Sequence, residues 1–114
     1  MQPPSETPLE ISVTDVEALR KGKTPFFLLD CREPDEHQLV HINGATLIPM
    51  GQIPNRVSEL ASRQGERIVV YCHHGGRSLR VTQWLRQQGF SQAQNMRGGI
   101  DAWAIEVDPS LPRY

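Results

Sequence analysis

The sequence predicts an α/β fold in which a central parallel sheet lies between two layers of helices. Short apolar segments alternate along the chain with segments of helical periodicity, and the links between them are short. Two of the apolar segments, 26–30 and 67–71, are almost continuous, which is typical of strands covered on both faces. Strands that alternate with helices over short links pair in parallel. We therefore expect a three-layer α/β sandwich with a central five-stranded parallel sheet flanked by helices.

Each expected strand is an apolar or β-branched run that ends at turn-forming residues. The five runs are 9–12, 26–30, 44–49, 67–71 and 93–96.

The expected helices are recognised by their ends. Thr14 followed by Glu17 forms a capping-box pattern, which predicts that the first helix begins there. Gly89 is placed to end the fourth helix in a left-handed conformation. The other helices are expected to begin at Pro34 (continuing to about Val40), at Pro54, after the loop that follows 67–71, and within 98–103.

Length and composition indicate a single soluble domain. The formal net charge of the 114 residues is −1, so we expect neither nucleic acid nor an anionic membrane as a partner. Residues 63–114 nevertheless carry 7 basic residues, all arginine, against 4 acidic ones, so an anionic substrate would favour this half. No apolar run approaches the roughly 20 residues of a membrane-spanning helix.

Two cysteines cannot form a disulfide framework, and the first residues do not resemble a secretory signal, so we expect a cytoplasmic protein. Residues 1–8, rich in Pro, Ser and Thr, are expected to form a flexible leader, and residues 9–114 a single domain.

The sequence "YCHHGGRS", residues 71–78, is the strongest candidate for a functional site. The chain must leave a buried strand and enter a helix within a few residues, and Gly75 and Gly76 supply the backbone freedom for this turn. Backbone amides of such a turn, together with those of a helix start, form a concavity suited to an anion. Arg77 and the helix start favour the thiolate form of Cys72, which predicts a reactive cysteine at the carboxyl end of a strand.

Four separated motifs in this order resemble the rhodanese family. The segment "YCHHGGRS" resembles the active-site loop of that family, in which a strand-end cysteine begins a Cys-x-x-Gly-x-Arg-Ser turn. The other three are "LLDCRE" (28–33), "HINGATLIP" (41–49) and "MRGGIDAW" (96–103). The ending "VDPSLPRY" is also similar to the rhodanese domain that closes some E1-like sulfur-carrier-activating proteins, although no adenylating domain is present.

The resemblance implies a rhodanese-like fold and a thiosulfate sulfurtransferase without metal or organic cofactor. Cys72 would take a sulfane sulfur from a small anionic donor such as thiosulfate, carry it as a persulfide, and pass it to a thiophilic acceptor such as cyanide or a thiol. The backbone amides of residues 73–77 (His73, His74, Gly75, Gly76 and Arg77) would hold the persulfide, Arg77 would attract the donor, and the Ser78 hydroxyl would donate a hydrogen bond.

Two alternatives accompany this interpretation. The first alternative is a phosphatase or an arsenate reductase. Related phosphatases place five residues between the cysteine and the arginine of this loop, whereas four residues separate Cys72 from Arg77. The smaller loop fits a sulfur atom better than a phosphate group, which disfavours this alternative. The second alternative is a binding or relay module that receives persulfide from a desulfurase and docks on a sulfur-carrier protein without fast turnover of small donors.

Several neighbouring residues are expected to have structural roles. The rings of His73 and His74 are expected to be exposed, so that their backbone amides matter more than metal binding or proton transfer. Asp30 and Arg32 are interpreted as scaffold residues beneath the loop. Cys31 is expected to pack in the core. The resemblance also implies that the strands ending at Cys31 and Cys72 lie side by side, about 4.8 Å apart, which would allow a disulfide between the two cysteines.

Overall fold

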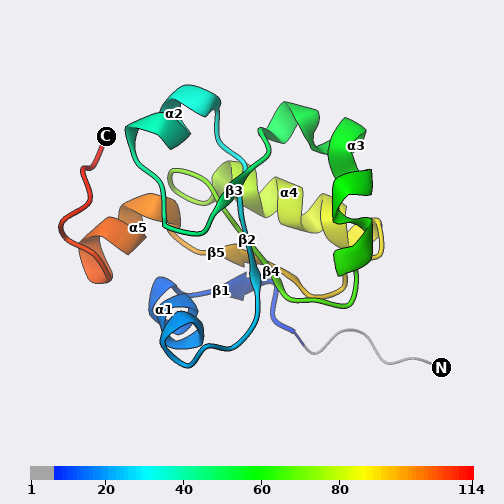
Figure 1. Ribbon diagram of the computed structural model, residues 1–114, viewed down its shortest axis with the longest axis horizontal. Helices are drawn as coiled ribbons and strands as arrows, with labels where there is room; N and C mark the ends of the chain where they lie inside the picture. The colour runs from blue at the N-terminus through cyan, green and yellow to red at the C-terminus, as the bar shows by residue number, and fades with distance from the viewer. Residues whose placement is uncertain (1–6) are drawn as a thin grey trace.

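The computed structural model describes residues 7–114 and contains five parallel strands in the order β1-β5-β4-β2-β3 (Figure 1). The predicted α/β sandwich with a five-stranded parallel sheet is therefore confirmed. The strands are β1 Glu10–Ile11, β2 Phe27–Asp30, β3 Thr46–Leu47, β4 Ile68–Tyr71 and β5 Ala93–Met96.

Of the expected leader 1–8, residues 1–6 lie outside the described part of the chain. The carbonyls of Thr7 and Pro8 accept hydrogen bonds of 2.8 and 3.0 Å from the Arg86 guanidinium.

Helices cover both faces of the sheet. One face carries α1 (Val13–Lys21) and α5 (Gly99–Glu106), which contact each other. The other face carries α4 (Gly76–Gln87), α3 (Ile53–Arg56) and two 3-10 helices, Met50–Gln52 and Val57–Arg63. The short helix α2 (Pro34–Leu39) follows the carboxyl end of β2 (Figure 1). No helix of residues 7–114 has the length and apolar character needed to cross a membrane.

Two helix starts differ from the sequence predictions. Ser12, not Thr14, caps α1, because the Ser12 hydroxyl accepts a 3.1 Å hydrogen bond from the Asp15 amide and the Ser12 backbone is extended. The helix expected to open at Pro54 is α-helical only over Ile53–Arg56 and then tightens into a 3-10 helix.

The central strand β4 divides its side chains between two cores, because successive strand residues point to opposite faces. Val69 and Tyr71 belong to the core under α1 and α5, whereas Val70 and Cys72, the residue directly after the strand, belong to the core under α3 and α4. All four are almost completely buried. The carboxyl ends of β2 and β4 lie side by side, since Asp30 pairs with Tyr71, and this edge of the sheet carries the candidate site.

Candidate functional site

The loop after β4 encloses the thiol of Cys72 in hydrogen-bond donors. The amides of Gly75 and Ser78 lie 3.1 and 3.4 Å from the Cys72 Sγ, and the Ser78 hydroxyl lies 3.3 Å from it. The turn requires a left-handed residue, which Gly75 provides with φ +106° immediately before α4. The sulfur therefore sits in a cradle at the start of a twelve-residue helix.

This cradle favours the thiolate. Burial opposes ionisation of Cys72, but the hydrogen bonds from the Ser78 hydroxyl, the Ser78 amide and the Gly75 amide outweigh it and lower the pKa of the thiol. The positive charge of Arg77 acts in the same direction. Cys72 is only 1% exposed, so a reacting group must enter the loop to reach it.

The start of α5 holds the loop in place through hydrogen bonds to its backbone. The amides of Ile100 and Asp101 donate hydrogen bonds of 2.9 and 3.1 Å to the carbonyls of Cys72 and His73. Gly99 allows this close approach, because a Cβ atom there would lie 2.3 Å from the His73 carbonyl oxygen and 2.5 Å from that of Cys72. With these carbonyls occupied, the loop keeps its amides directed at the sulfur.

Arg77 forms an ion pair instead of pointing freely into solvent. Its guanidinium donates two hydrogen bonds, of 2.7 and 2.9 Å, to the carboxylate of Glu36 on α2. This bidentate pair lowers the pKa of Glu36 to about 2. A free anion at this arginine must compete with a carboxylate that is already bound.

Tyr114 joins the loop to this ion pair. Its ring stacks on His73 with centroids 3.8 Å apart and planes 8° apart, and its hydroxyl donates a 2.7 Å hydrogen bond to Glu36. The same hydroxyl accepts a 2.9 Å hydrogen bond from Arg32. The last residues of the described chain thus lie beside α2, as Figure 1 shows.

A buried charge pair supports the floor of the site. Arg32 and Asp30 are fully buried and share hydrogen bonds of 2.9 and 2.7 Å, and Arg32 also donates to the Val40 carbonyl at 2.6 Å. The Tyr71 hydroxyl donates to Asp30 at 3.1 Å. Burial raises the pKa of Asp30, but the hydrogen bonds from Arg32 and His37 outweigh it, so the net shift is downward. These contacts match the scaffold role expected for Asp30 and Arg32.

A second polar chain holds the Ser78 hydroxyl. This hydroxyl lies 2.5 Å from the Asn95 side-chain oxygen, while the Asn95 amide nitrogen donates a 2.9 Å hydrogen bond to Glu10. The Glu10 carboxylate can only accept, so it fixes which end of the Asn95 amide faces Ser78. A hydroxyl has one proton, and that of Ser78 therefore has two acceptors, the Asn95 oxygen and the Cys72 sulfur.

Within the described part of the chain, one group of side chains has the spacing of metal ligands. Ligand atoms of His73, His74 and Asp101 all lie within 4.8 Å of one another. However, Arg113 already donates hydrogen bonds of 2.8 and 3.2 Å to the Asp101 carboxylate. His74 is exposed as expected, whereas the His73 ring is half-buried beneath Tyr114 and its Nε2 atom has no hydrogen-bond partner.

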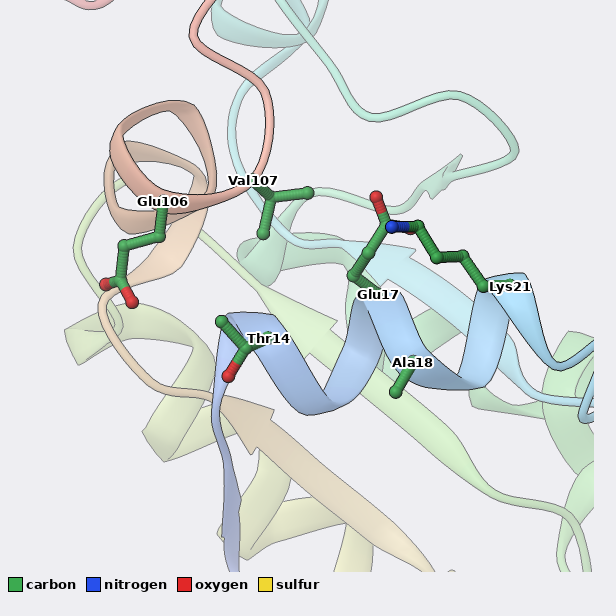
Figure 2. Close-up of a pocket in the computed structure, with 6 residues that line it drawn as sticks. All are labelled: Thr14, Glu17, Ala18, Lys21, Glu106 and Val107. Atoms are coloured by element: carbon green, nitrogen blue, oxygen red, sulfur yellow. The ribbon is translucent and has the colours of Figure 1, made fainter.

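A separate hollow of about 310 Å³ lies between α1 and the end of α5 (Figure 2). No cysteine or histidine lines it, and none of its lining residues belongs to the loop after β4. They are Thr14, Glu17, Ala18, Lys21, Glu106 and Val107.

The structure brings the predicted loop residues together around Cys72 but assigns them different tasks. Of the amides of residues 73–77, that of Gly75 reaches the sulfur, and the Ser78 amide and hydroxyl are the other donors. Sequence reasoning missed Glu36, Asn95 and Tyr114. The acid at Glu36 lies one helical turn beyond the Asp-x-Arg-Glu motif, but no local signal pairs it with an arginine 41 residues later.

Comparisons with known proteins found similar sequences and structures. Residues 12–106 match the family described as Rhodanese-like domain. The protein named adenylyltransferase and sulfurtransferase MOCS3 of Arabidopsis thaliana is 30% identical over 118 residues, covering 91% of this chain and 25% of that protein. A protein of Allochromatium vinosum named sulfurtransferase is 42% identical over 77 residues, covering 68% of this chain and 70% of that protein.

A solved structure has a similar fold. The crystal structure of a rhodanese-like domain protein from Staphylococcus aureus has a TM-score of 0.78 and 28% identity, covering 92% of this chain and 97% of that one. By contrast, the chain spans only between 22% and 30% of the length of several longer curated relatives.

Proposed function

Because the chain belongs to the rhodanese-like domain family, we propose that it is a sulfurtransferase in which Cys72 carries the transferred sulfur. The observation that supports this most directly is the set of three donors, two amides and one hydroxyl, within 3.4 Å of the Cys72 sulfur. Such a cradle stabilises a negative sulfur, first as thiolate and then as persulfide. Residues 9–114 would form the functional domain and residues 1–8 its leader.

The proposed reaction has two steps. The Cys72 thiolate attacks the outer sulfur of thiosulfate, the bond between the two donor sulfurs breaks, and sulfite leaves with its electron pair. The product is a Cys72 persulfide anion, so the charges balance. A thiophilic acceptor, cyanide or a thiol, then attacks the outer sulfur and regenerates the thiolate. The chemistry requires no metal and no organic cofactor.

The loop residues take different parts in this proposal. The amides of Gly75 and Ser78 hold the negative sulfur, while Gly76 begins α4 without obstructing the opening, since no atom lies within 4 Å of the position of a Cβ there. Arg77 favours the thiolate by its charge and binds the anionic donor in competition with Glu36. His73 and His74 form the rim through which the donor passes.

The biological donor and acceptor are proposed from the printed name of a relative. A relative named both adenylyltransferase and sulfurtransferase suggests that the acceptor is a sulfur-carrier protein and that a desulfurase persulfide is the donor. A reactive thiolate also suits a reducing cytoplasm. The Glu36–Arg77 pair favours a second possibility, a relay module with slow turnover of small anions, because the arginine is already occupied.

Intact-protein mass spectrometry tests the proposal. After brief incubation with thiosulfate, the parent protein should gain about 32 Da, and Cys72→Ser should gain nothing. A Cys72→Ser variant that still takes up sulfur would refute the assignment of Cys72. Rapid cyanide turnover would favour the enzyme, whereas uptake only from a protein persulfide would favour the relay.

A further inference from the structure

The second cysteine of the chain lies directly beside the first. Asp30 and Tyr71 are the last pair of the β2–β4 ladder, and one further hydrogen bond, of 3.1 Å from the Cys31 amide to the Tyr71 carbonyl, joins the two chains just beyond it. Cys31 and Cys72 directly follow this last pair. Neighbouring strands are about 4.8 Å apart, which lies within the range of roughly 4.4–6.8 Å between the Cα atoms of a disulfide.

The two side chains also point to the same face of the sheet. Leu29 pairs with Val70, and side chains alternate along each strand, so Cys31 and Cys72 share the face occupied by this pair. Both belong to the core under α3 and α4. The two side chains are thus expected to be neighbours within this core.

Cys31 has no structural task that requires a thiol. It is fully buried and free, and its side chain makes a weak 3.5 Å hydrogen bond from Sγ to the Tyr71 carbonyl. Burial and the nearby negative charge of Cys72 raise the pKa of Cys31, whereas the pKa of Cys72 is lowered, so Cys31 loses its proton less readily than Cys72. Cys31 is therefore the weaker nucleophile of the two and does not compete with Cys72 for the donor, and it must give up its proton when it attacks.

We propose that Cys31 is a resolving thiol that discharges the Cys72 persulfide as sulfide, which gives the domain a second, persulfide-reducing activity. This inference rests on the proposed sulfur transfer for the origin of the persulfide. The substrate class is therefore a sulfane-sulfur donor, and the co-reactant that restores the protein is a dithiol.

The step balances without an external oxidant. The Cys31 sulfur attacks the inner sulfur of the Cys72 persulfide, a Cys31–Cys72 disulfide bond forms, and the bond to the outer sulfur breaks. The outer sulfur leaves as hydrosulfide, taking the electron pair and the proton of the Cys31 thiol. The persulfide is reduced to sulfide while the two thiols are oxidised to the disulfide. A dithiol then reduces this disulfide by exchange and returns both cysteines to the starting state.

The Cys72 persulfide would have two competing reactions, transfer to an acceptor and reduction by Cys31. A thiophilic acceptor that enters the loop attacks the outer sulfur, whereas Cys31 attacks the inner sulfur from the core. Since Cys31 is held beside its target, its reaction needs no encounter and proceeds whenever no acceptor is bound. Cys31 would then limit the lifetime of a Cys72 persulfide that has met no acceptor.

The first experiment loads the protein and follows both products. Parent protein, Cys31→Ser and Cys31→Ala, each at low concentration and free of reductant, are incubated with thiosulfate, and intact mass and released sulfide are followed with time. The parent should pass from a gain of about 32 Da to a loss of about 2 Da, with about one sulfide per chain, and dithiothreitol should restore its mass. Both variants should keep the added sulfur at least about tenfold longer.

Cys31→Ser is the matched control because its hydroxyl can still donate to the Tyr71 carbonyl, and Cys31→Ala serves if the serine variant does not fold. A parent protein that keeps the added sulfur as long as the variants would overturn the inference and leave the sulfur-transfer proposal intact.

A second experiment separates the inference from the proposed function. Methyl methanethiosulfonate converts Cys72 to a methyl disulfide without any sulfane-sulfur donor, and Cys31 should then displace methanethiol to give the same loss of about 2 Da. The two variants should instead retain the methylthio group. Retention by the folded parent would overturn the resolving role, whereas a disulfide here with no sulfur uptake from any donor would support the thiol pair and refute the proposed transferase.

Discussion

Replacing Ser78 by alanine tests how the cradle activates Cys72. The change removes a hydroxyl that lies 3.3 Å from the Cys72 sulfur but keeps the amides of Gly75 and Ser78 in place. Ser78 is completely buried, so water cannot replace the lost donor. We therefore expect the pKa of Cys72 to rise, because burial, which opposes ionisation, is then offset by fewer hydrogen bonds.

The magnitude follows from the strength of a hydrogen bond to a charged group, about 1.5–3 kcal/mol. The lower end applies here, because the Ser78 proton is shared with the Asn95 oxygen at 2.5 Å and two amide donors remain. Since about 1.4 kcal/mol corresponds to a factor of ten, the reactivity of Cys72 at a fixed pH below its pKa should fall about tenfold. Loss of the partner of Asn95 should also reduce the free energy of unfolding by about 1–3 kcal/mol.

The assay is the rate of alkylation of Cys72 by iodoacetamide as a function of pH, measured by intact mass in a Cys31→Ser background. Thr82→Val is the matched control, since it removes another fully buried hydroxyl one turn along α4, whose 2.7 Å hydrogen bond goes to the Ser78 carbonyl. This control should lose stability without moving the alkylation profile. Superimposable profiles for the parent and Ser78→Ala, or an equal shift in Thr82→Val, would refute the reasoning.

Three further predictions concern the parts around the cradle. Gly99→Ala should lower the free energy of unfolding by about 2–4 kcal/mol in urea titrations, because the added Cβ would clash with the carbonyls of the loop. The control Gly76→Ala should change it by less than about 1 kcal/mol, and equal effects of the two substitutions would contradict the close approach at Gly99. The pKa of Glu36 lies at about 2 in the fold and ordinarily at 4.5, so its pairing stabilises the protein above pH 4.5 and is lost as the pH falls toward 2. The stability advantage of the parent over Glu36→Gln, at most about 3 kcal/mol, should therefore shrink across that window, and parallel curves would contradict the pairing. Tyr114→Phe removes the hydroxyl and should lower the free energy of unfolding by about 1 kcal/mol. Tyr114→Ala also removes the stacking on His73 and should lower it by about 1 kcal/mol more; equal thermal unfolding of the two variants would show that the ring does not contribute.

Most elements of the fold could be predicted from the sequence because their signals are local. The continuous apolar runs at 26–30 and 67–71 predicted buried strands, and the alternation of strands with helices predicted parallel pairing. The start of α1 was misplaced because Thr14 and Ser12 can both cap a helix. Which of them does so depends on the residue at which the chain leaves β1, and that depends on the pairing of β1 with β5.

The sequence by itself determined the loop after β4, since a strand-end cysteine, two glycines and an arginine within six residues specify a turn whose amides face inward. Only the tertiary structure decided what surrounds that loop. Glu36 binds Arg77, and Tyr114 stacks on His73, across 41 residues in each case. The pairing of β2 with β4 brings Cys31 and Cys72, the residues after these strands, into one core. Periodicity and turn chemistry act over a few neighbours along the chain, whereas these contacts depend on which strands pair and where each crossover returns.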